Sequence, residues 1–121
     1  MPGRHKHSSM IKQQAECCLA DTEKTVMNNK TLKFAAMSNE FALLFGFNRT
    51  ELHSMRPVLG PQTNLNAMHM AMSLCSEFNH PVSIPVLLYS RAADPINMVI
   101  EFTKIDDQYV MLQCSPLRPQ H

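Results

Sequence analysis

The chain has 121 residues, of which 45% are hydrophobic and 17% charged, and its formal net charge is +1. This length and hydrophobic share are typical of one folded domain. A protein that neutralises many phosphates usually carries a strong basic excess, so no nucleic-acid partner is expected. No apolar run approaches the roughly 20 residues of a membrane helix, so no membrane partner is expected either.

The first residues, 1–9, are basic and polar, and no apolar stretch of the secretory-signal type follows them. We therefore expect an intracellular protein, cytoplasmic or nuclear, with reduced thiols. The four cysteines, Cys17, Cys18, Cys75 and Cys114, form no CxxC pair and no zinc-binding spacing. They predict free thiols and no metal site.

Methionine is unusually frequent, with ten residues, and tryptophan is absent. The methionine side chain is flexible and polarizable and fills irregular gaps. This composition fits a plastic core, and it also fits an adaptable binding cavity or partner surface.

The N-terminal part predicts little regular structure before two short strands. Residues 1–15 are expected to form a tail with a short helix, and the domain proper is expected to span 16–115. Residues 16–21 predict a first strand, and the alternation in 31–35 predicts a second. A polar turn through residues 28–30 separates them.

The pattern then changes to that of a helix. Ser38 can cap its N-terminus, and Phe41, Leu44 and Phe45 fall on one helical stripe. Gly46 can adopt the positive φ that ends a helix. Residues 48–52 predict a further helical turn, followed by a loop.

A longer helix is predicted next, with Thr63 as its N-cap and residues 79–81 as its end. Its core-facing stripe comprises Leu65, Met68, Met72 and Cys75.

The last third predicts three strands, at residues 82–90, 96–105 and 108–115, and a C-terminal tail at 116–121. Pro85 indicates an edge position or a bulge in the first of them. Strands at both ends of the chain with helices between them predict an α+β domain. We expect a five-stranded antiparallel sheet with helices packed on one face.

Both faces of the last strand are largely apolar. Tyr109, Met111 and Gln113 share one face and are interpreted as inward-pointing. Val110, Leu112 and Cys114 share the other and are interpreted as an interaction surface, which the N-terminal helix or a second subunit could cover. On this interpretation Leu112→Glu weakens self-association.

Several segments, in this order, resemble the PAS domain family. Residues 38–47, SNEFALLFGF, are similar to the family's N-x-x-F-x-x-L-x-G-Y helix, and Thr50-Glu51-Leu52 is similar to the E-E-L that follows it. Residues 59–63, LGPQT, resemble the L-x-G-P-x-T segment of the LOV-like branch. Residues 88–91, LYSR, with Asp94-Pro95, resemble the Y-R-x-D-G-x-P hairpin.

The resemblance has one clear departure, in the residues that handle flavin. LOV photoreceptors carry a reactive cysteine before the G-P step, and residues 53–59 contain none. The hairpin positions that bind the flavin ring fall near Leu88 and Met98, which are apolar, and Gln113 alone matches a flavin-contacting residue. Flavin is therefore not expected.

The resemblance implies a cavity between sheet and helices that could hold a small ligand. Its candidate lining comprises Phe34, Phe41, Phe45, Met68, Met72, Met98, Ile100, Met111 and Gln113. The alternative is that these residues simply fill the core. Some PAS domains hold haem through a histidine on the long helix, so His69 is a candidate ligand in a second hypothesis of a cofactor-binding sensor.

An enzyme is the third hypothesis, and the sequence does not favour it. No G-x-S-x-G, P-loop or dinucleotide-binding motif occurs. We therefore expect a non-catalytic sensory or regulatory module that acts in signal transduction through protein–protein interaction, either dimerisation or partner docking, with no cofactor.

Overall fold

The structure, a computed structural model, describes residues 24–117. The short helix expected at 10–16 and the strand expected at 16–21 lie outside these residues.

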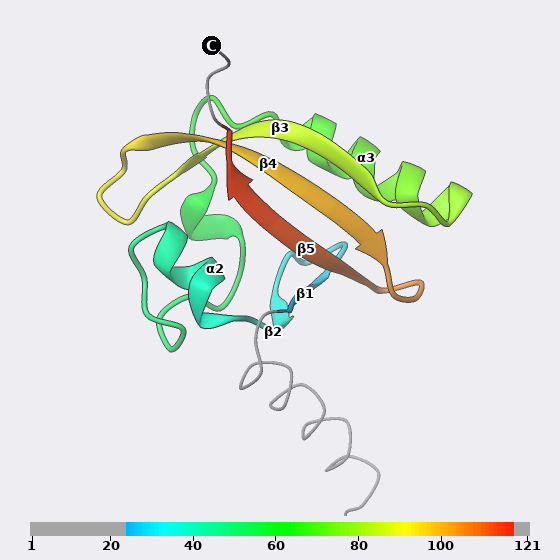
Figure 1. The fold of residues 1–121 in the computed structure, drawn as a ribbon, viewed down its shortest axis with the longest axis horizontal. Helices are drawn as coiled ribbons and strands as arrows, with labels where there is room; N and C mark the ends of the chain where they lie inside the picture. The colour runs from blue at the N-terminus through cyan, green and yellow to red at the C-terminus, as the bar shows by residue number, and fades with distance from the viewer. Residues whose placement is uncertain (1–23, 118–121) are drawn as a thin grey trace, which may run out of the picture.

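Five strands form one antiparallel sheet in the order β2-β1-β5-β4-β3 (Figure 1). Their bounds are β1 Thr25–Asn28, β2 Phe34–Ala36, β3 Val82–Tyr89, β4 Pro95–Lys104 and β5 Tyr109–Pro116. The predicted α+β fold is confirmed. β3 lies at the edge of the sheet, as Pro85 indicated, because a proline cannot donate a ladder hydrogen bond.

The first strand of the sheet was not predicted. It ends at Asn28, whose side-chain oxygen accepts hydrogen bonds from the backbone N–H of Lys30 and Thr31, both at 2.9 Å. Leu32 then takes a positive φ of 64°, which closes the hairpin. Because this turn is tight, β1 ends directly at it and occupies residues 25–28 rather than the predicted 16–21.

Two α-helices and one 3₁₀ helix connect the strands. They are α2 Asn39–Leu44, η2 Arg56–Val58 and α3 Leu65–Phe78. Ser38 caps α2 as predicted, since its hydroxyl accepts a hydrogen bond from the N–H of Phe41 at 3.0 Å. Gly46, just after α2, has a φ of 82°.

Three local predictions were wrong. Asn64 caps α3 in place of Thr63, because the Asn64 side chain accepts the N–H of Ala67 at 3.0 Å. Residues 48–52 form a turn rather than a helix, in which Glu51 accepts the N–H of Asn48 at 2.9 Å. The loop that follows contains η2.

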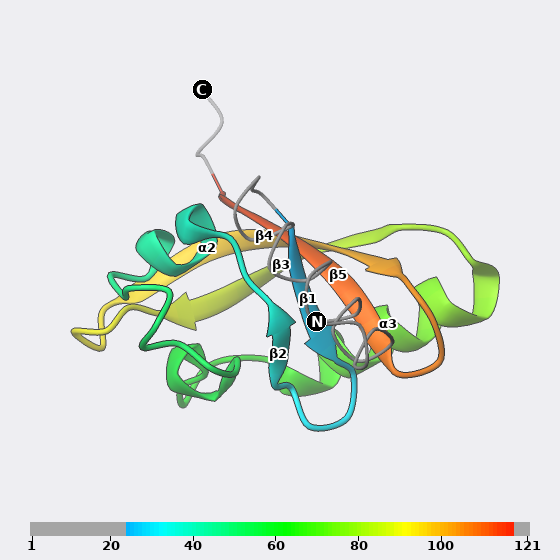
Figure 2. The ribbon, with the colours of Figure 1, turned by 90° about the horizontal axis from the view of Figure 1, so that it is seen from below.

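The core lies between one face of the sheet and the helices. Met98, Ile100 and Phe102 alternate along β4 and are at most 1% exposed. They share a buried cluster with residues of both helices, among them Phe41 and Met68. α3 packs on β3 and β4, and Figure 2 shows it running beneath the long strands.

Within the described residues, no helix has the length and apolar character needed to cross a membrane.

Candidate functional site

The two faces of β5 are the reverse of the sequence interpretation. Val110 and Leu112 are each 1% exposed and belong to the core cluster. Leu112 pairs in register with the buried Thr25 on β1 and the buried Phe102 on β4. Cys114 is half-buried and packs against the same cluster. The three residues assigned to an interaction surface are therefore inward-pointing, and Leu112→Glu would place a charge in the core.

The face that points away from the helices carries Tyr109, Met111 and Gln113. Met111 and Tyr109 are half-buried, and Gln113 is exposed. Sequence reasoning could not distinguish the faces of residues 109–112, because apolar side chains occur on both. Which face of β5 points inward is decided by its pairing with β1, a strand that was not predicted.

The candidate cavity residues mostly fill the core. Phe41, Phe45, Met68, Met72, Met98 and Ile100 are at most 4% exposed and lie in the one buried cluster. Phe34 packs against this cluster, with its ring edge-on to Phe41 at a centroid distance of 5.4 Å. Met111 and Gln113 lie on the other face of the sheet. The nine candidates therefore do not line a common cavity.

His69 lies on an exposed side of α3, outside the core. It lines a shallow groove with Lys30 of the β1–β2 turn and Asp107 of the β4–β5 turn. Its imidazole is therefore not placed to ligate a haem held between helices and sheet. The hypothesis of a haem site at His69 is not supported by this geometry.

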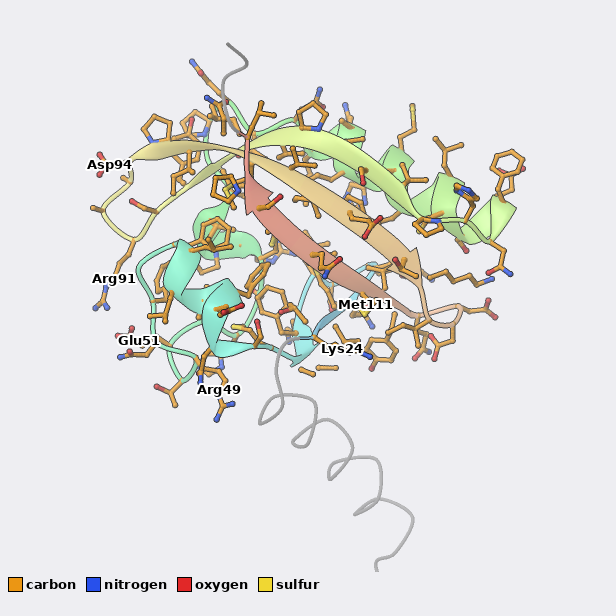
Figure 3. The ribbon with its side chains drawn as sticks, in the orientation of Figure 1. Lys24, Arg49, Glu51, Arg91, Asp94 and Met111 are labelled. Carbon is orange, nitrogen blue, oxygen red and sulfur yellow. The ribbon has the colours of Figure 1, made fainter. Side chains whose placement is uncertain are left out.

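The outer face of the sheet carries apolar side chains in two places, which the register pair Glu101 and Gln113 separates. Val26 on β1 pairs with Met111 on β5, and Val99 on β4 pairs with Pro85 on β3. Val26, Met111 and Val99 are half-buried although no described element covers them. Met111 is labelled on β5 in Figure 3. Glu101 is the one charged residue at the outer positions of β3, β4 and β5.

A second surface feature is an open groove between α2 and the C-terminal half of β5, with a volume of about 680 Å³. Its apolar lining comprises Phe41, Leu43, Leu44, Leu112 and Cys114, and its polar lining comprises Thr25, Ser38, Glu40 and Gln113. The buried Thr25 hydroxyl accepts the N–H of Ser38 at 3.3 Å. Burial raises the pKa of the Cys114 thiol to about 12, so this thiol is not primed for reaction.

The hairpin that resembled a PAS motif has a structural role. Arg91 donates a hydrogen bond to Glu51 at 2.9 Å, and its guanidinium lies 5.8 Å from the ring centroid of Phe47 (Figure 3). The backbone N–H of Arg91 also bonds the carbonyl of Phe45 at 2.7 Å. These contacts fix the β3–β4 turn to the end of α2.

No protein-family model matches the sequence, and no curated protein is similar to it. Solved structures do match. The LOV domain of the blue-light photoreceptor Aureochrome1 superposes with a TM-score of 0.61 at 14% identity, over 78% of this chain and 86% of that one. The PAS domain of the fruit-fly ELK potassium channel superposes with a TM-score of 0.60 at 12% identity, over 93% and 98%.

The chain has a PAS fold. An RNA-binding LOV receptor also matches this PAS-like domain, with a TM-score of 0.58 at 20% identity, over 81% of this chain and 31% of that one. The absence of a nucleic-acid partner therefore stays a prediction.

The likeness to LOV domains weighs against the expectation of no flavin, and the residues at the inner positions of the sheet bear on it directly. Leu88, Met98 and Leu112 occupy inner positions of the sheet and are at most 1% exposed. In the described residues the buried polar side chains are Thr25 and Ser38, and both accept backbone hydrogen bonds. The inner sheet positions Leu88, Met98 and Leu112 present apolar side chains where a flavin ring would need polar partners, so these positions do not fit the group.

Proposed function

We propose that this PAS-like domain is a non-catalytic sensory or regulatory module that works by protein–protein contact through the outer face of its sheet. The observation that carries the proposal is that the Val26–Met111 pair, and Val99 farther along the sheet, lie on a face that no described helix covers. An antiparallel sheet with a solvated face normally alternates apolar and polar residues. Apolar side chains that remain at the surface mark a contact site.

The partner that we propose for this face is a second copy of the chain. A two-fold contact places the same patch on both protomers, so an uncharged patch suits it. The outer positions of β3 to β5 come close to this requirement, because Glu101 is the one charged residue among them. The PAS and LOV neighbours support a sensory or regulatory role at the level of the fold.

A ligand-binding sensor is the alternative, and it receives less support. The likeness to LOV domains favours it, whereas the inner face is filled by side chains such as Phe102, Ile100 and Met98. A ligand there would have to displace them, at the cost of the contacts they make with both helices.

Sedimentation velocity over a concentration series tests the proposal. Met111→Lys places a charge in the centre of the proposed contact, and it should weaken self-association roughly tenfold or more. The matched control is Met70→Lys, because Met70 is 64% exposed on α3 and lies away from this face.

Circular dichroism checks that both variants keep the fold. A wild-type protein that stays monomeric throughout the series would contradict the proposal. Equal weakening by the two variants would contradict it as well.

A further inference from the structure

The groove between α2 and β5 has an apolar surface that the described residues leave open. Leu43 on its rim is 64% exposed. Leu44 and Cys114, which also line it, are only half-buried. A volume of about 680 Å³ is large enough to take several side chains.

The groove also contains an unpaired strand edge. β1 begins at Thr25, which pairs with Leu112. β5 continues to Pro116 with β4 on its other side, so in the described part of the chain Gln113 and the residues after it have no neighbour on the β1 side. Thr25 lines the groove. The chain that precedes β1 therefore arrives at this groove.

We propose that residues 17–20 of the same chain, Cys-Cys-Leu-Ala, dock in this groove, with Leu19 against Leu43 and Leu44. They are the only four consecutive apolar residues before β1. They lie five to eight residues before Thr25, and an extended chain of that length spans roughly 17–28 Å. The segment can therefore fold back over the groove from its point of attachment.

The tether favours this occupant over a free partner. A segment joined by a short linker acts at an effective concentration in the millimolar range, so half occupancy needs about 4 kcal/mol. Burial of Leu19 supplies about 1.5–3 kcal/mol of this, and the other apolar side chains of the run supply the rest. The acidic residues that flank the run, Glu16 and Asp21, stay in solvent when only the apolar side chains are buried. This contact lies on the α2 side of β5 and is independent of the outer sheet face.

The thiol of Cys114 reports on the groove directly. In the 121-residue chain at low concentration, Leu19→Glu should raise the rate at which N-ethylmaleimide alkylates Cys114 by roughly tenfold, the effect of removing one leucine from an apolar site. The matched control is Ile11→Glu, which introduces the same charge outside the apolar run and should leave the rate unchanged. Peptide mass spectrometry assigns the modified cysteine.

A change on the groove side should have the same effect. Leu43→Glu is tolerated by the fold because this side chain is mostly exposed, and it should raise the Cys114 rate as Leu19→Glu does. The double variant should react no faster than either single variant, because both remove one contact. Cys75 is fully buried, so its alkylation rate reports global unfolding. The ratio of the Cys114 rate to the Cys75 rate therefore shows whether a variant opens the groove or unfolds the whole domain.

Two results would overturn the proposal. One is a Cys114 rate in Leu19→Glu equal to that of the wild type. The other is a wild-type rate that falls as protein concentration rises, which would assign the occupant to a second copy of the chain.

Discussion

At the scale of single residues, the segment that resembled a PAS motif fastens the loop before α3 to the edge strand. The Thr63 hydroxyl accepts the N–H of Gly60 at 2.9 Å and donates to the carbonyl of Leu87 at 2.7 Å. The Tyr89 hydroxyl accepts the N–H of Gln62 at 3.3 Å. These hydrogen bonds join the loop at residues 60–63 to β3, so the motif has a structural role here.

Gly60 is required at its position by the ring of Tyr89. A Cβ added at Gly60 would overlap the Tyr89 ring. Gly60→Ala should therefore lower the free energy of unfolding by about 1–3 kcal/mol, measured by urea denaturation. In the double variant with Tyr89→Ala the overlap is gone, so the combined loss should be smaller than the sum of the single losses. Strict additivity would show that the ring is not the cause.

At the scale of elements, α3 has a buried side and an apolar exposed side. Met68, Met72 and Cys75 face the sheet and are at most 4% exposed. Met70 and Phe78 are 64% and 66% exposed. The helix is capped by Asn79, whose N–H bonds the carbonyl of Cys75. Its left-handed φ of 52° lets the next N–H, that of His80, reach the same carbonyl at 3.3 Å.

A matched pair of methionines tests this orientation of α3. Met72→Ala should cost about 2–5 kcal/mol of stability, because it leaves a cavity in the core. Met70→Ala should change stability by less than about 0.5 kcal/mol, because the side chain is in solvent. Urea denaturation of the two variants measures both values. Similar losses would mean that the helix is rotated from the orientation described.

Elements with one clear periodicity could be predicted from the sequence, and the others could not. The stripe of Met68, Met72 and Cys75 predicted α3, and the alternation of Met98, Ile100 and Phe102 predicted the inner face of β4. The face of Leu112 could not be predicted, because it depends on pairing with β1, a contact distant in sequence. The groove beside α2 was also missed, since it forms where three distant segments meet.

At the scale of the whole molecule, a PAS fold is combined with a filled interior and an apolar outer sheet face. The inner face is used for packing, so the apolar surfaces that the described residues leave open include the outer face around Met111, the groove beside Leu43 and the exposed side of α3 around Met70. The proposed contacts on the first two are different in kind. One joins two copies of the chain, and the other holds its own N-terminal segment.

The methyl groups of the methionines provide the most direct test of the central claim. Heteronuclear NMR spectra of protein labelled at the methionine methyls, recorded over a range of concentrations, report on each face separately. The Met111 signal should shift or broaden as the protein concentration rises. Met68 and Met98 in the core and Met70 on α3 should stay unchanged. A concentration-dependent Met70 signal beside an unchanged Met111 signal would contradict the claim that the outer sheet face is the contact surface.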